Sequence, residues 1–111
     1  MNAIEMTDKM RAIFDECQRF RAAGQAEYAR DADAFANFKR VGERLGLSPE
    51  KVLMVYLEKH LDGIHAFIGG HRSQREPIQG RINDAIVYLC LLEAMIEEHA
   101  LPTALPIVTT R

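Results

Sequence analysis

Two acidic side chains on one predicted helix have the spacing of a metal-ion site. Glu58 and Asp62 are four residues apart in the sequence. Residues at that spacing share one face of an α-helix, with Cβ atoms about 6 Å apart. Carboxylate oxygens are ligands that Mg²⁺ prefers. The alternative is a solvated helix face, because Lys59 and His60 dilute the negative charge between them.

A third carboxylate, Asp84, lies between apolar residues in a later helical segment. Because burying a bare charge costs free energy, a carboxylate beside a core stripe needs a partner. A bound metal ion would serve. A salt bridge is the alternative, and its candidate partners are Arg81, Lys59 and Arg40.

The segment 69–76 joins two glycines to basic residues and leads straight into a predicted helix start. Backbone N–H groups and the helix dipole make such an end attractive to phosphate, and Arg72 and Arg75 would add charged contacts. The segment contains no P-loop or dinucleotide fingerprint, however, and the alternative that this favours is a plain connector.

Tyr28, Asn37 and Phe38 have the chemistry of a base-binding group. An aromatic ring in a polar connector can stack on a base, and an amide can read its edge. The alternative is that these residues pin the connector to the core. The histidines offer no comparable pattern, because His60 and His65 are five residues apart and lack zinc-ligand spacing.

These residues need helices to position them, and apolar residues recurring at steps of three and four predict such helices. The first has a plausible cap at Thr7-Asp8 and loses its pattern around Gly24. A polar connector then covers residues 25–32. The apolar stripe of this helix consists of Met6, Met10, Ile13, Phe14, Cys17 and Phe20.

Local signals mark the ends of three further helices. Asp33 is a predicted N-cap, and Gly46 suits the left-handed position that ends a helix. Ser48-Pro49-Glu50 supplies a cap, a proline at the first helical position and an acid in the first turn. We expect the third helix from Pro49 to about Ile68, some 30 Å long. The fourth runs from Pro77 to about His99.

The faces of the two long helices predict how they pack. The third carries Leu53, Leu57, Leu61, Ile64 and Ile68 on one stripe. The expected core face of the fourth is Ile78, Ile82, Ala85, Ile86, Leu89, Leu92 and Ile96. Its other sides are also apolar, with Val87, Cys90, Leu91 and Met95. A helix that is apolar all round is central in a domain or sandwiched against a second subunit.

We therefore predict an all-α protein, a compact bundle of about four helices that forms a homo-oligomer. The two long helices should be antiparallel, because the connection between them is short. The length of 111 residues fits one domain, which we assign to residues 1–100. Residues 101–111 contain two prolines and no period, which predicts an extended or disordered tail.

Charge and hydropathy exclude some classes of partner. The formal net charge is −2, and no run of lysine and arginine favours binding to duplex nucleic acid. The first residues lack the pattern of a signal peptide. The longest strictly apolar run, residues 86–92, is too short to span a bilayer. We therefore expect a cytoplasmic protein without a membrane partner.

The chain contains a series of short motifs, namely Asn37-Phe38, Leu45-Gly46-Leu47-Ser48-Pro49-Glu50, Glu58-Lys59, Glu76-Pro77-Ile78 and Asp84 with Tyr88. These motifs resemble those of small phage and prophage proteins grouped as nucleotide-modification-associated proteins. The motifs lie within roughly residues 27–97. The set looks like a distant relative of the MazG-like all-α nucleoside triphosphate pyrophosphohydrolases. In those enzymes, acidic residues on two antiparallel helices hold Mg²⁺, and water attacks a nucleotide phosphate.

The resemblance implies Mg²⁺-dependent hydrolysis of a (deoxy)nucleoside triphosphate to the monophosphate and pyrophosphate. Glu58 and Asp84 would be catalytic and would hold the ion together with Asp62. The phosphates would contact Lys59, Arg72 and Arg75, and the base would contact Tyr28 and Asn37.

One residue departs from the family pattern. Arg81 stands where the pyrophosphohydrolases carry a glutamate, which puts a positive charge where a cation would bind. The alternative function is therefore a non-enzymatic helical oligomer that binds a nucleotide or a host protein. Arg81 would then contact phosphate oxygens, a role that suits its planar, bidentate guanidinium.

Overall fold

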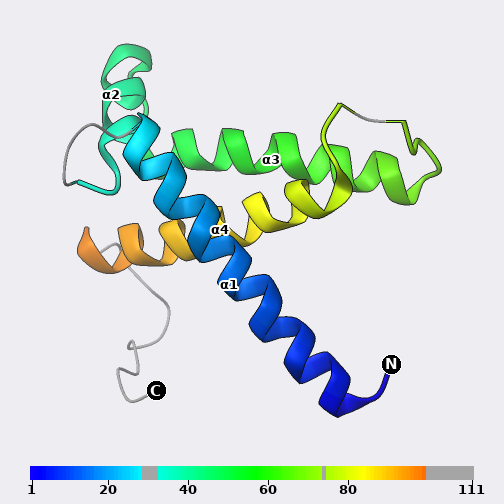
Figure 1. Cartoon of the computed structure of the whole chain (residues 1–111). Coiled ribbons are helices and arrows are strands. Elements are labelled where there is room, and N and C mark those ends of the chain that lie inside the picture. The colour runs from blue at the N-terminus through cyan, green and yellow to red at the C-terminus, as the bar shows by residue number, and fades with distance from the viewer. Residues whose placement is uncertain (29–32, 74, 100–111) are drawn as a thin grey trace, which may run out of the picture.

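The computed structural model describes residues 1–28, 33–73 and 75–99, and the side chains of this part except those of residues 25–28. It contains helices α1 (Ala3–Tyr28), α2 (Ala36–Leu45), α3 (Pro49–Ile68) and α4 (Ile78–Glu98), shown in Figure 1. The described ranges contain no strand. The fold is therefore all-α, as the sequence predicts. The tail expected at residues 101–111 lies outside the described part.

The two long helices, α3 and α4, run antiparallel and form the most extensive contact between elements (Figure 1). The short helix α2 packs against α3, and α1 crosses α4. The α3–α4 pair is therefore the centre of the bundle. Its connection, residues 69–77, brings the end of α3 back to the start of α4.

The predicted end of α2 and the predicted start of α3 are confirmed. Gly46 adopts a φ of 70°, the left-handed conformation that ends α2. The Ser48 side chain accepts a hydrogen bond from the Lys51 N–H at 3.3 Å, and Pro49 begins α3. Asp33 differs from the prediction. It accepts from the N–H of Phe35, only two residues on, so it closes a turn just before α2 instead of capping the helix.

The first helix extends beyond its predicted limits at both ends. Asn2 and Glu5 cap each other, each side chain accepting from the other's backbone N–H at 2.8–2.9 Å. The cap predicted at Thr7-Asp8 is therefore wrong. At the other end α1 continues to Tyr28, because residues 22–28 are mostly good helix formers around the single Gly24.

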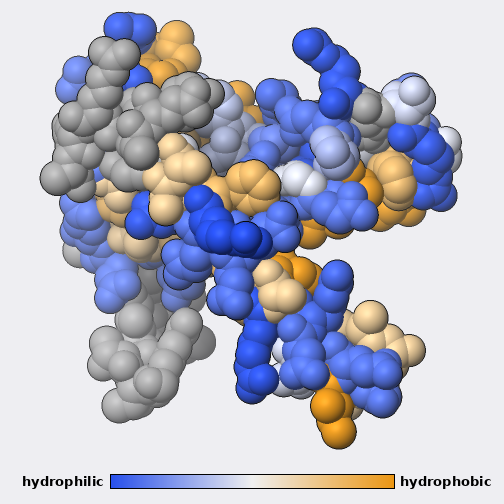
Figure 2. Space-filling view, viewed as in Figure 1, coloured by the Kyte–Doolittle hydropathy of each residue, from blue (hydrophilic) through white to orange (hydrophobic). Residues whose placement is uncertain are grey.

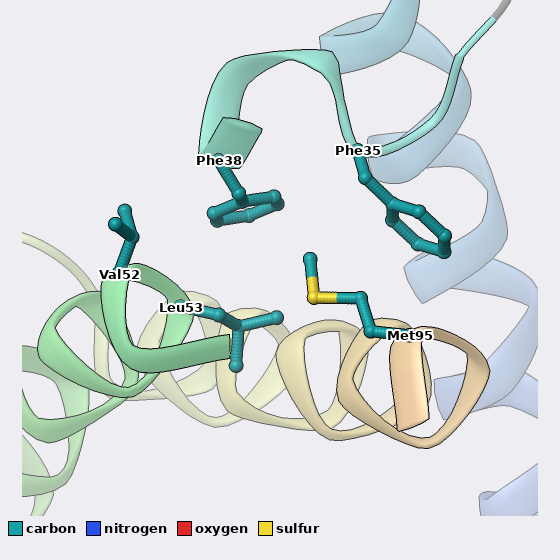
Figure 3. Packing of buried hydrophobic residues seen from close by; sticks show 5 residues of the cluster. All are labelled: Phe35, Phe38, Val52, Leu53 and Met95. Atoms are coloured by element: carbon teal, nitrogen blue, oxygen red, sulfur yellow. The ribbon is translucent and has the colours of Figure 1, made fainter. Parts of the chain in front are cut away.

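The hydrophobic core lies where α2, α3 and α4 meet. Figure 3 shows Met95 of α4 pointing between the rings of Phe35 and Phe38. Val52 and Leu53 of α3 close the cluster from the other helix. Partly buried residues pack around it, namely Ala34, Val41, Tyr88, Leu91 and Leu92.

The structure corrects the predicted faces of α4. Met95, expected on an outer face, is fully buried, whereas Leu89, expected in the core, is 53% exposed. Ile82 is also exposed, and so is Ile68 at the end of α3. The reason is that α4 is contacted by both α3 and α1. Because α4 is apolar all round, periodicity alone does not identify the faces that these two neighbours cover.

The N-terminal part of α1 projects beyond α4 as a separate arm (Figure 1). Of the predicted stripe of α1, only Cys17 is buried. Figure 2 shows apolar atoms at the tip of this arm. The exposed large apolar residues of α1 are Met1, Ile4, Met6, Met10, Phe14 and Phe20. No helix in the described part is long and apolar enough to cross a membrane.

Candidate functional site

Three potential metal ligands meet at the α3–α4 contact. His60 comes from α3, Glu76 from the connection before α4, and Asp84 from the second turn of α4. One ligand atom from each lies within 4.8 Å of the other two. The His60 Nδ1 atom is 3.9 Å from Glu76 Oε2, and its Nε2 atom is 3.6 Å from Asp84 Oδ2. The antiparallel pairing of the helices therefore assembles a group of one imidazole and two carboxylates.

The three side chains differ in their access to solvent. His60 is only 6% exposed, while the side chains of Glu76 and Asp84 are 42% and 46% exposed. The buried His60 Nδ1 has no hydrogen-bond partner. Leaving such a nitrogen unsatisfied costs roughly 1–3 kcal/mol. The group thus has a buried imidazole at its base and two carboxylates that open toward solvent.

The carboxylates of this group influence each other's charge. Burial raises the pKa of Asp84 above its usual value, and the nearby Glu76 carboxylate raises it further. His60, Lys59 and Arg81 act in the opposite direction. Two interpretations fit this arrangement: a protonated His60 could balance the two acids, or a bound cation could do so.

An aromatic cluster borders the group. The Tyr88 ring centroid is 5.6 Å from that of His60, and Tyr56 stacks on Tyr88 at 6.4 Å. Phe38 meets both tyrosines edge-on. Burial, followed by the charge of Asp84, raises the pKa of the Tyr88 hydroxyl, which therefore stays neutral at physiological pH. The Tyr88 ring therefore packs beside the His60 imidazole, and Phe38 and Tyr88 line the same cleft as Asp84.

A cleft of about 190 Å³ lies between α1, α2 and α4. Its lining joins polar Asn37 and Asp84 to the rings of Phe20, Phe38 and Tyr88. A second cleft, of about 440 Å³, lies near the start of α4 and is lined by Glu76 and Asp84 among others. Asp84 therefore borders both clefts.

Of the residues selected from the sequence, Asn37 and Asp84 line the same cleft. The Asn37 Oδ1 atom accepts a hydrogen bond from Arg40 at 2.6 Å, which leaves its amide N–H groups as the donors for a ligand. Lys59 and Arg81 lie close enough to Asp84 for their charges to act on it. The Arg81 side chain lies against Gly63, so it crosses α3 where that helix has no side chain.

The remaining selected residues lie elsewhere. Glu58 and Asp62 are exposed on α3 and do not belong to the group of three ligands found among the described residues. The Arg72 guanidinium lies 4.3 Å from the centroid of the Phe67 ring, and Arg75 is exposed in the connection. The Tyr28 side chain lies outside the described residues.

His60 is the residue that the sequence did not indicate as a ligand. It follows Leu57 by three residues and precedes Ile64 by four, so it occupies the buried stripe of α3. The stripe predicted from the sequence placed Leu61 there instead, and Leu61 is only partly buried. A histidine inside an apolar stripe was the available signal, because a buried imidazole needs polar partners.

Comparison of the chain with family models, with curated proteins and with solved structures finds no match.

Proposed function

We propose that this protein binds a nucleoside triphosphate together with a divalent cation and hydrolyses it to the monophosphate and pyrophosphate. The observation that supports this most is the position of Asp84. It belongs to the three-ligand group, and it also lines the cleft that contains Asn37, Phe38 and Tyr88. A cation at Asp84 would therefore lie beside a cleft whose lining suits a base.

In this proposal the aromatic side chains stack against the base and Asn37 donates to its edge. The triphosphate then extends toward Asp84. Lys59 and Arg81, whose charges already act on Asp84, offset the negative charge of the phosphates. The resemblance of the sequence motifs to MazG-like pyrophosphohydrolases implies the same reaction.

The cation would supply two effects in the reaction. It would lower the pKa of a bound water molecule, and it would neutralise charge that develops on the phosphate oxygens. Asp84 and Glu76 would hold it from the half-exposed side of the group. The exposed Glu58 and Asp62 would have no direct part in that ligand set, in contrast to the arrangement that the sequence resemblance implies.

The test is pyrophosphate release from the common ribo- and deoxyribonucleoside triphosphates, with Mg²⁺ or Mn²⁺ present. Asp84→Asn should abolish release, because it keeps the shape of the side chain and removes the charge that a hard cation needs. Asp15→Asn, an exposed position on α1, is the matched control and should leave release unchanged. Glu58→Gln distinguishes the ligand set seen in the structure from the set that the sequence resemblance implies. It should abolish release only if Glu58 holds the ion. Absence of release from every nucleotide would refute the hydrolase.

A second candidate, a non-enzymatic oligomer that binds a nucleotide, is favoured by two observations. The positive charge of Arg81 lies close enough to lower the pKa of Asp84, and α1 carries several exposed apolar side chains. Contiguous apolar patches of this kind often mark protein–protein interfaces. Calorimetry that detects nucleotide binding without turnover would favour this candidate. Light scattering that gives a monomer mass at micromolar concentration would exclude the oligomer.

A further inference from the structure

We propose that His60, Glu76 and Asp84 form a three-ligand site for a divalent transition-metal ion, such as Mn²⁺, Co²⁺ or Zn²⁺, in preference to Mg²⁺. This ion would be the cation of the proposed function, and only its role in the reaction rests on that function. Binding of the ion follows from the three side chains themselves.

The donor set determines the preference. Mg²⁺ requires near-octahedral oxygen ligands and usually retains several water molecules. Imidazole nitrogen favours first-row transition metals, and carboxylate oxygen is compatible with them as well. A group with one imidazole and two carboxylates therefore binds a transition ion more tightly than it binds Mg²⁺. With three protein ligands, the site would also keep a position open for water or a phosphate oxygen.

The distances suit an ion better than they suit direct hydrogen bonds. Two atoms that each lie about 2.1 Å from a common ion are roughly 3 to 4.2 Å apart. One ion binds only one ring nitrogen of His60, so only one of the two separations joins two of its ligands. This is either the 3.6 Å from Nε2 to Asp84 Oδ2 or the 3.9 Å from Nδ1 to Glu76 Oε2, and each falls in that range. Both are longer than a normal hydrogen bond, whose heavy-atom distance is at most about 3.2 Å. The three ligand atoms lie within 4.8 Å of one another, so the other, half-exposed carboxylate must rotate inward to reach the same ion.

The buried imidazole provides an independent indication of a ligand. The Nδ1 atom of His60 is shielded from solvent and has no hydrogen-bond partner. A protonated His60 at the observed distances would leave this atom unsatisfied. A metal ion bound at Nδ1 would give this buried atom the partner that it lacks. The Tyr88 ring 5.6 Å away holds the imidazole in place.

The experiment uses the full chain after treatment with a chelator, with Co²⁺ as a spectroscopic probe. Co²⁺ should produce ligand-field absorption bands, and calorimetry should show Mn²⁺ or Zn²⁺ binding at least about tenfold more tightly than Mg²⁺. His60→Gln should weaken Co²⁺ binding by about tenfold or more and alter the bands. His65→Gln, an exposed histidine on the same helix, is the control and should change neither.

A second variant, Glu76→Gln, tests the site even if His60→Gln unfolds the protein. Glu76→Gln lies in the connection and is half exposed, so it should fold normally and still weaken Co²⁺ binding. Lack of Co²⁺ binding at millimolar concentration would overturn the proposal, and so would equal binding by wild type, His60→Gln and Glu76→Gln. Co²⁺ binding without nucleotide turnover would refute only the hydrolase. Turnover with Mg²⁺ that does not depend on His60 would refute only the transition-metal site.

Discussion

The contact between Gly63 and Arg81 provides a test of how α3 and α4 are packed beside the site. A Cβ atom added to Gly63 would lie 2.6 Å from the Cδ, Nε and Cζ atoms of Arg81. Atoms that are not bonded do not approach so closely, so Gly63→Ala must displace the middle of the Arg81 side chain. Replacing a helix-interior glycine by alanine would otherwise stabilise the protein by about 1 kcal/mol.

The expected magnitudes follow from these two opposing effects. Overpacking of this kind costs typically about 1–3 kcal/mol. The Arg81 Nε atom is buried without a hydrogen-bond partner, so its displacement toward solvent recovers part of that cost. We therefore expect Gly63→Ala to lower the free energy of unfolding by between about 0 and 2 kcal/mol. In an Arg81→Ala background the same substitution should instead stabilise by about 1 kcal/mol.

The assay is urea unfolding followed by circular dichroism for the wild type, the two single variants and the double variant. The cycle should give a coupling free energy of about 1–3 kcal/mol between the two positions. Equal effects of Gly63→Ala in both backgrounds, within about 0.3 kcal/mol, would show that Arg81 does not lie against Gly63.

Two further predictions concern stability. Met95→Ala should destabilise by about 2–5 kcal/mol because Met95 is fully buried. Met10 is exposed, so Met10→Ala should change the free energy of unfolding by less than about 0.5 kcal/mol. Similar losses of stability for both variants in urea unfolding would contradict the placement of Met95 in the core. Burial tends to raise the pKa of Glu50. The hydrogen bond and charge of His99, together with hydrogen bonds to the backbone and Ser48, outweigh burial and lower the pKa below the ordinary 4.5. Because the folded-state pKa is depressed, this stabilisation is present above pH 4.5 and is lost as the pH falls below it. Glu50→Gln should therefore cost about 1 kcal/mol at pH 6 and little at pH 3, and an equal cost at both pH values would count against the link.

Much of the site could not be predicted from the sequence, because its ligands come from separate elements. Asp84 was identifiable, since a carboxylate among apolar residues of one helix requires a partner. Its actual neighbours, His60 and Glu76, are 24 and 8 residues away in the chain. Glu58 and Asp62 share a helix face by spacing alone, but spacing does not tell which face of α3 meets α4. That depends on the packing of Leu53 and Val52 against the core.

The sequence by itself determined the all-α fold class and those helix ends that depend on local chemistry. Ser48 and Pro49 begin α3 and Gly46 ends α2, because capping hydrogen bonds and left-handed backbone involve only neighbouring residues. Only the tertiary structure decided that Met95 is buried and Leu89 exposed. Both are apolar residues of one helix, so the burial of each depends on where α1, α2 and α3 lie. The same positions bring an imidazole and two carboxylates together, and no local signal encodes that meeting.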